Sequence, residues 1–311
     1  MIDALSKAAF GSLASSSTLQ RLASRYGMRS NTSFARRFVA GETIDEAIAA
    51  ARSVEADGLS QTLDLLGESV ASEREARAAT DAYLAMLPRI VAAGIGRNIS
   101  IKLTQLGLDL SSEVAETHLR AILERARQDA FFVRIDMENS PYVEATLAIF
   151  ERVWHDGLTN VGVVLQSALK RSEADLARVL ALGARIRLVK GAYKEPAAVA
   201  WQAKSDVDAA YVRMMEQLLP RGHFPAIATH DPEMIARARA IAGQAGLASD
   251  RYEFQMLYGV RRDLQARLRQ EGEGVRVYIP YGREWFPYFM RRLGERPANV
   301  AFVLKSLLRD R

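Results

Sequence analysis

The chain has 311 residues, of which 49% are hydrophobic, and this suits either one large barrel or two ordinary domains. It has no cysteine, which excludes disulfides, thiolate metal sites and a thiol nucleophile, and which favours a reducing compartment. The formal net charge of +5 is modest, and acids are interleaved with Lys and Arg beyond the amino terminus, so nucleic acid is not an expected partner. The best apolar stretch, Ala85 to Gly96, is interrupted by Arg89 and falls short of the roughly 20 residues that span a bilayer.

The first 40 residues are rich in Ser and Arg and nearly free of acids, as in organelle transit peptides and also in helices packed on a domain. Asp3 is unusual in a transit peptide. Thr43 and Glu46 have the spacing of a capping box, and Gly58 is placed to end the helix that they begin. We therefore predict that residues 1–57 form a helical segment packed on a domain that spans residues 58–311.

Eight short apolar runs, most of them rich in Val and Ile, alternate with amphipathic stretches of helix length. The predicted strands are Gln61 to Leu66, Ile99 to Leu103, Phe131 to Ile135, Val161 to Leu165, Ile186 to Val189, Ala226 to Thr229, Tyr252 to Met256 and Val275 to Ile279. Pro280 and Gly282 are expected to stop the last strand. N-cap residues indicate helix starts at Ser140, Ser172 and Asp231. This alternation predicts an α/β fold, a (β/α)8 barrel with additional N-terminal helices.

Polar residues follow or end seven of the predicted strands. They are Lys102, Asp136, Gln166, Lys190, His230, Gln255 and Tyr278. In such barrels the loops after the strands converge, so these side chains are expected to share one site. Lys102 and Asp136 also suit a structural ion pair, and His230 suits a capped loop or half of a metal site with Asp231. The chain has four scattered His, so no metal is predicted.

A pair of adjacent arginines lies near the carboxyl end. From Trp285 onward apolar residues recur at helical spacing, and Arg291 or Arg292 lies one helical turn before Glu295. A carboxylate there could brace a guanidinium, and two such cations suit the binding of a small carboxylate in a fixed orientation. The same residues are also typical of a solvated helix face.

The segment from Tyr278 through Pro280 and Gly282 to Arg291, Arg292 and Glu295 resembles the C-terminal signature of the proline dehydrogenases, flavoenzymes that oxidise L-proline to pyrroline-5-carboxylate. Further segments resemble that family: Ser100-Ile101-Lys102-Leu103, Asp136-Met137-Glu138, Leu165-Gln166-Ser167, Arg187-Leu188-Val189-Lys190-Gly191-Ala192-Tyr193, Ala228-Thr229-His230 and Glu253-Phe254-Gln255-Met256-Leu257. The resemblance covers roughly residues 38–305. The short chain is similar to the monofunctional bacterial form, which lacks DNA-binding and aldehyde dehydrogenase extensions.

The resemblance implies FAD in the barrel mouth and assigns residues to three roles. The implied cofactor-binding residues are Met137, Gln166, Arg187, Val189, Lys190, Gly191, Ala192, Thr229, His230, Gln255 and Leu257. The implied substrate-binding residues are Lys102, Asp136, Tyr193, Tyr278, Arg291, Arg292 and Glu295. The implied catalytic residues are Asp136, Arg187 and Lys102. On physical grounds, Gly191 lets backbone approach a flat ring or phosphate, and Lys190 supplies charge for a pyrophosphate.

The mechanism that the resemblance implies is hydride transfer from proline to flavin N5, with Arg187 near N5 and electrons passed on to a quinone or another acceptor. The amine must lose a proton, and Asp136, Lys102 and water are the candidate acceptors. A tyrosine at the Tyr278 position argues for proline over hydroxyproline. A cytoplasmic location with peripheral contact at the inner membrane face is expected, and the tail from Ala298 to Leu308 is a candidate contact or a helix packed on the barrel.

Three alternatives differ in testable ways. A Schiff-base aldolase or lyase on the same barrel would use Lys190 or Lys102 as nucleophile and would need no flavin. A hydroxyproline dehydrogenase would share the cofactor but not the substrate. The third alternative is a basic binding protein for nucleic acid or anionic membrane, and retardation that vanishes at physiological salt would reduce it to nonspecific charge. Flavin absorbance of the purified protein separates the first and third alternatives from the proline dehydrogenase hypothesis.

Overall fold

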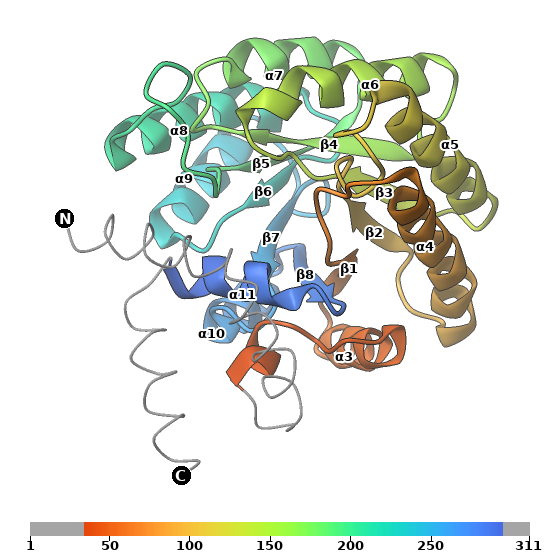
Figure 1. The fold of residues 1–311 in the computed structure, drawn as a ribbon. Helices are drawn as coiled ribbons and strands as arrows, with labels where there is room; N and C mark the ends of the chain where they lie inside the picture. The colour runs from red at the N-terminus through yellow and green to blue at the C-terminus, as the bar shows by residue number, and fades with distance from the viewer. Residues whose placement is uncertain (1–33, 295–311) are drawn as a thin grey trace.

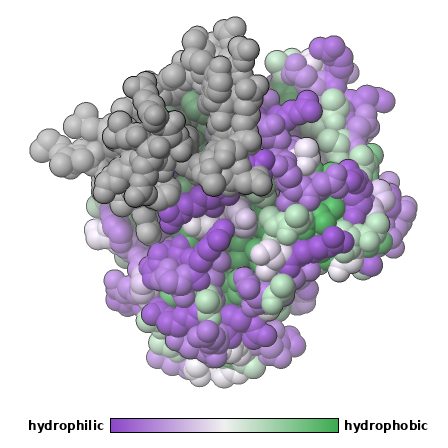
Figure 2. All heavy atoms as spheres, turned by 90° about the horizontal axis from the view of Figure 1, so that it is seen from below, coloured by the Kyte–Doolittle hydropathy of each residue, from purple (hydrophilic) through white to green (hydrophobic). Residues whose placement is uncertain are grey.

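The computed structural model describes residues 34–294 (Figure 1). Most of the predicted N-terminal segment, Glu295 and the tail from Ala298 to Leu308 therefore lie outside the described residues. On the face shown in Figure 2, most of the described surface is hydrophilic, and hydrophobic residues form smaller patches. Within residues 34–294, no helix combines the length and the apolar character needed to cross a bilayer.

Eight parallel strands close into a barrel in sequential order, with β8 pairing back onto β1. They are β1 (Ser60–Leu65), β2 (Asn98–Ile101), β3 (Phe132–Ile135), β4 (Val161–Gln166), β5 (Arg185–Val189), β6 (Ala226–Ala228), β7 (Glu253–Leu257) and β8 (Val275–Tyr281). The closed parallel barrel confirms the predicted (β/α)8 fold. Every predicted strand overlaps an observed one, because short β-branched runs between helical stretches can bury both faces only in such a sheet.

The helices form a ring around the strands, with two exceptions to the usual order. They are α3 (Ile44–Ala56), α4 (Glu73–Ala93), α5 (Ser112–Gln128), α6 (Val143–His155), α7 (Ser172–Ala181), α8 (Lys204–Arg221), α9 (Pro232–Gln244), α10 (Arg262–Gln270) and α11 (Trp285–Gly294), with short 3-10 helices η1 (Phe34–Arg37) and η2 (Ser140–Tyr142). Helix α3, which precedes the barrel, packs against β1 and β8. Helix α11, which follows β8, instead lies over the barrel mouth (Figure 1).

A second apolar cluster, separate from the main core, seats α11. Its buried members are Ala35, Phe38, Val39, Leu66, Trp285, Phe286, Tyr288, Phe289 and Met290. The indole of Trp285 is 1% exposed, packs edge-on to Phe289 with ring centroids 5.9 Å apart, and donates a hydrogen bond to Glu42 at 3.1 Å. The backbone N–H of Gly282 donates to Gly41 at 2.9 Å. The segment before α3 therefore fixes the turn from which α11 starts.

Two predicted helix starts are confirmed and two are wrong. The capping box of Thr43 and Glu46 is present, and Asp231 caps α9. Ser172 is the first residue of α7 rather than its cap, since its hydroxyl donates to the carbonyl of Gln166. Ser140 likewise begins η2, and its hydroxyl donates to Glu195. Both hydroxyls are used for tertiary contacts that helix-start rules do not consider.

The prediction that Pro280 stops β8 is also wrong, because the strand continues to Tyr281. Strand β7 ends beside Tyr278, whereas pairing with β1 continues as far as Tyr281. Pro280 lacks an N–H on the side that faces β7, and no β7 residue is paired there, so no ladder hydrogen bond is lost. There the Pro280 carbonyl instead accepts a hydrogen bond from the N–H of Ala40 at 2.9 Å.

Replacing Thr43 by Ala should lower the free energy of unfolding by about 1 kcal/mol, because the hydroxyl that accepts from the Glu46 N–H is lost. Urea denaturation followed by circular dichroism measures this. Thr43→Ser keeps the oxygen and serves as the control, with a midpoint close to that of the unmodified chain. Equal midpoints for Thr43→Ala and Thr43→Ser would contradict the role of the cap.

Candidate active site

A cavity of about 600 Å³ opens at the carboxyl ends of the strands, within the size range of small-molecule sites. Strands β4 to β8, the residues that directly follow β2 and β3, and helix α11 all contribute to its lining. Every predicted site residue within the described chain lines it: Lys102, Asp136, Met137, Gln166, Arg187, Val189, Lys190, Gly191, Ala192, Tyr193, Thr229, His230, Gln255, Leu257, Tyr278, Arg291 and Arg292. These residues therefore line one cavity, and their roles in a site remain predictions.

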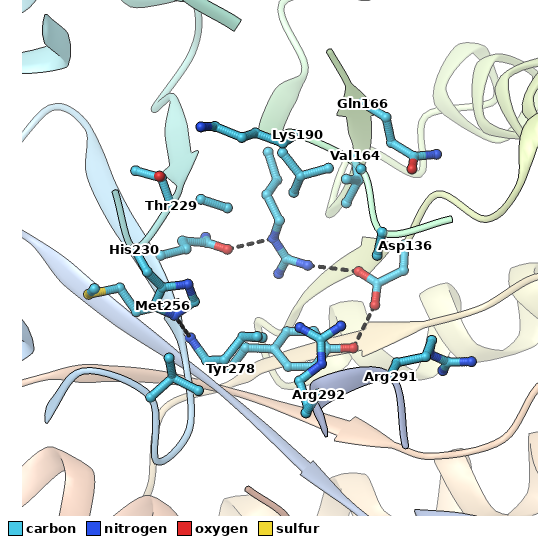
Figure 3. A pocket seen from close by; sticks show the side chains of 18 of the residues that line it. Asp136, Val164, Gln166, Lys190, Thr229, His230, Met256, Tyr278, Arg291 and Arg292 are labelled. Atoms are coloured by element: carbon cyan, nitrogen blue, oxygen red, sulfur yellow. Dashed lines mark hydrogen bonds and ion pairs between the residues drawn. The ribbon is translucent and has the colours of Figure 1, made fainter. Parts of the chain in front are cut away.

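The two sides of the cavity differ in what they present. Figure 3 shows Lys190 and Gln166 on one side, and Arg291, Arg292 and Tyr278 on the other. Their elements explain this separation, because Gln166 ends β4 and Lys190 follows the neighbouring strand β5, whereas the arginines belong to α11. A long ligand can thus contact both sides at once.

Lys102 lies in a buried cluster of charges. Its Nζ is 3.3 Å from an Asp64 oxygen and 3.7 Å from an Asp136 oxygen, so the predicted pair with Asp136 is present. Burial by itself would lower the pKa of Lys102, but the two carboxylates outweigh it and raise that pKa above its ordinary value. Burial is also the main cause that raises the pKa of Asp64, and Lys102 opposes it. Lys102 consequently carries its proton at neutral pH.

Asp136 joins two further groups besides Lys102. One oxygen accepts a hydrogen bond from the Arg187 guanidinium at 2.7 Å, and the other accepts one from the Tyr278 hydroxyl, also at 2.7 Å. Asp136 and Tyr278 can be seen pointing toward each other in Figure 3. Burial, reinforced by the nearby carboxylates, raises the pKa of Tyr278, so its hydroxyl remains a donor. Asp136 thus orients a cation and a phenol at the centre of the site.

The Arg187 guanidinium is held from several directions. Besides its bond to Asp136, Nε donates to the side-chain oxygen of Gln255, and Nη2 donates to the Ser100 hydroxyl at 3.2 Å. Its guanidinium carbon also lies 5.3 Å from the centre of the Tyr278 ring, within range of a cation–π contact. These contacts leave the positive charge at a fixed place on the floor of the cavity.

Arg291 forms a two-pronged ion pair with Glu68, at 2.8 and 3.3 Å. Burial would raise the pKa of Glu68, but the Arg291 guanidinium outweighs it and holds that pKa below its ordinary value. The predicted partner, Glu295, lies outside the described residues. Next to this pair, the guanidinium of Arg292 lies 5.2 Å from the ring centre of Tyr288. Both arginines are therefore oriented by neighbours rather than extended into solvent.

The loop after β5 lies close to β4. Gly191 has φ of +114°, and a Cβ there would come within 3.1 Å of the Gln166 side-chain oxygen and 3.2 Å of the Ala168 Cβ. The Gln166 amide in turn donates to the carbonyl of Glu138 at 2.7 Å. A side chain at position 191 would fill this part of the cavity wall, so the backbone is kept bare there.

Lys190 lines the cavity but is also engaged by acids beside it. It pairs with Asp208 at 2.5 Å and with Asp231 at 3.1 Å. The ring of His230 accepts a hydrogen bond from the N–H of Leu257 at 2.9 Å, which places this histidine in the wall between β6 and β7. Lys190 therefore has a charge that is already balanced by two acids.

Two carboxylates of the site escaped the sequence analysis. Asp64 is the strand-end polar residue of β1 and is fully buried, and its signal was a single acid within an otherwise suitable strand run. Glu68 lies in the loop after β1, 223 residues from its partner Arg291, and no local pattern marks such a pair. Asp64 lies within, and Glu68 follows, the one predicted strand for which no polar end was proposed.

A protein-family model described as "Proline dehydrogenase" matches residues 47–305. The chain belongs to the proline dehydrogenase family. "Proline dehydrogenase 1" of Bacillus subtilis (strain 168) is 42% identical over 297 residues, which cover 96% of this chain and 97% of that protein. "Proline dehydrogenase" of Deinococcus radiodurans is 41% identical over 313 residues, which cover 99% and 100% of the two chains.

Larger members of the proline dehydrogenase family match over part of their length. "Bifunctional protein PutA" of Escherichia coli (strain K12) is 30% identical, and the match covers 86% of this chain but 24% of that protein. A crystal structure of Bradyrhizobium japonicum PutA mutant D778Y has a TM-score of 0.72 at 26% identity, covering 86% of this chain and 31% of that one. PutA from Bdellovibrio bacteriovorus, at 24% identity and a TM-score of 0.79 over 32% of its chain, shares the barrel fold.

Replacing Asp64 by Asn should lower the pKa of Lys102, because one of the two carboxylates that raise it is neutralised while its burial is unchanged. Timed acetylation with acetic anhydride across a pH series, read by peptide mass spectrometry, reports the pH at which Lys102 becomes reactive. That pH should fall in Asp64→Asn, while the exposed Lys204 serves as an internal control that does not change. An unchanged or higher value for Lys102 would argue against the charge cluster.

Proposed function

We propose that this chain oxidises L-proline to 1-pyrroline-5-carboxylate in proline catabolism, using FAD held in the cavity at the barrel mouth. Membership of the proline dehydrogenase family supports the oxidation of proline. The observation that carries the site assignment is the convergence of Arg291, Arg292 and protonated Lys102 on one cavity. Three cations there suit an amino acid that presents a carboxylate.

The cavity suits FAD in shape and chemistry. Its wall is bare at Gly191, where a Cβ would crowd Gln166, and apolar side chains such as Val164 and Met256 line it. Such walls fit a flat ring, and backbone with no side chain admits it closely. The residues that would hold the cofactor are Met137, Gln166, Arg187, Val189, Lys190, Gly191, Ala192, Thr229, His230, Gln255 and Leu257. Bound FAD would supply the acceptor for the hydride that leaves the carbon next to the proline nitrogen.

The substrate carboxylate is assigned to Arg291, Arg292 and Lys102. Lys102 keeps its proton because of Asp64 and Asp136, so it acts in binding and is a poor acceptor for the proton of the amine. Asp136 and water remain as acceptors, and Asp136 already receives two hydrogen bonds. Tyr193, together with the ring of Tyr278, is assigned to the pyrrolidine ring.

The charges of the site argue against the Schiff-base alternative. A lysine nucleophile must be neutral, and Lys102 has its pKa raised. Lys190 is already engaged in ion pairs with Asp208 and Asp231, so its amine is held by two carboxylates. Tyr278 argues against the hydroxyproline alternative. Asp136 fixes the hydroxyl of Tyr278, and the family resemblance assigns this tyrosine to exclude a hydroxyl on the substrate ring.

We further propose that electrons leave the cofactor for a quinone, and that the chain works in the cytoplasm and meets the inner membrane face peripherally. The family resemblance supports this step. Turnover with L-proline and a quinone analogue, compared with and without vesicles of anionic phospholipid, tests it. A rate that is independent of quinone concentration would contradict a quinone acceptor.

Anaerobic addition of L-proline to the flavin-loaded protein should bleach the visible flavin band, because two electrons pass from substrate to cofactor. An absorption spectrum before and after addition measures this. D-proline at the same concentration serves as the stereochemical control and should bleach the band far more slowly. A band that persists with L-proline would overturn the proposed function.

Arg291→Met should raise the KM for proline at least about tenfold, since a charge-assisted contact to the carboxylate is worth about 1.5–3 kcal/mol. Flavin content per chain should be unchanged, since the lost contact belongs to the substrate. Arg213→Met is the matched control, because Arg213 also pairs with a glutamate but does not line the cavity. An unaltered KM in Arg291→Met would refute the carboxylate role.

A further inference from the structure

A chain of polar contacts runs from the cavity into the barrel interior. Glu253 and Gln255 are two residues apart on β7, so their side chains point to the same face of the strand. That face is the inside of the barrel, where the two residues are 6% and 5% exposed. Gln255 contacts Arg187 at the cavity floor, while Glu253 pairs with Arg276 of β8 at 2.9 and 3.0 Å. Glu253 does not itself line the cavity.

The chemistry of Glu253 fixes the orientation of its neighbour. Burial would raise the pKa of Glu253, but Arg276 outweighs it and keeps that pKa below its ordinary value, so the carboxylate is ionised. An ionised carboxylate only accepts hydrogen bonds. Gln255 must therefore turn its NH2 toward Glu253, as it does at 2.5 Å, and its oxygen toward Arg187. The opposite amide orientation would set NH2 against the guanidinium, donor against donor.

We propose that Glu253 is a positioning residue for the oxidation, which acts through the Gln255 amide to fix the guanidinium of Arg187. Asp136 and Ser100 hold the outer nitrogens of that guanidinium, and Gln255 holds Nε. The direction of the contact to Nε depends on Glu253, which lies outside the cavity. This inference rests on the proposed function, since Arg187 would place its charge beside the bound FAD.

Glu253→Gln tests the inference because the new side chain has the same shape but can both donate and accept. The Gln255 amide can then reverse, and Arg187 loses a fixed acceptor. We expect kcat to fall about tenfold, the equivalent of one hydrogen bond to a charged group, while the KM for proline changes less than about threefold. The reduction potential of the bound flavin, measured by dye equilibration, should become more negative.

Three further variants separate positioning from general stability. Glu253→Asp keeps a charge beside Arg276 but withdraws the carboxylate from Gln255, so it should show the same losses and replaces Glu253→Gln if that variant does not fold. The double variant Glu253→Gln/Gln255→Glu again presents a fixed acceptor to Arg187, so kcat should recover toward its original value. Arg276→Lys keeps a cation beside Glu253 and should leave both unchanged.

The outcomes distinguish this inference from the proposed function. An unmodified chain whose flavin is not bleached by L-proline overturns the proposed function. An unmodified chain that is bleached, together with a folded Glu253→Gln whose kcat and flavin potential match it, overturns the inference alone. A variant in which only the thermal midpoint falls also overturns it, because that result assigns Glu253 to stability. A loss of kcat that the double variant does not restore also counts against a role through Gln255.

Discussion

Burial of the aromatic face of α11 against the segment before α3 is the interaction on which the site depends. In a regular (β/α)8 barrel the last helix joins the outer ring. Here α3 packs beside β1 and β8, and Phe38, Trp285 and Phe289 hold α11 over the mouth instead. Fully burying one such side chain stabilises the fold by about 1.5–3 kcal/mol. Arg291 and Arg292 reach the cavity because of this seating.

The site balances its charges in pairs. Its three principal cations each have a carboxylate partner, in the pairs Lys102 with Asp64, Arg187 with Asp136, and Arg291 with Glu68. Paired in this way, the cations can be kept partly buried without the full cost of desolvation. They are also oriented before a ligand arrives, which reduces the reorganisation that binding would otherwise require. An arriving carboxylate therefore meets fixed donors instead of flexible side chains.

Local patterns predicted what depends on local physics. The strand runs, the capping box of Thr43 and Glu46, and the polar strand ends that meet in one cavity all follow from periodicity and barrel geometry. Contacts between distant segments did not follow, because no spacing rule links Glu68 to Arg291 across 223 residues. Pro280 shows the same limit, since its tolerance in β8 depends on where β7 ends.

The pairing of β8 with β1 sets the order in which the barrel can be completed. Ser60 is paired in register with Arg276, so the ring closes only when the last strand is available. Until then a nascent chain exposes two unpaired strand edges, which are templates for association with other chains. Pairing of β8 with β1 is also expected to be slow, because the chain loses the entropy of closing this long loop before the stabilising contacts form. During synthesis the first strand therefore keeps an unpaired edge until almost the entire barrel has left the ribosome.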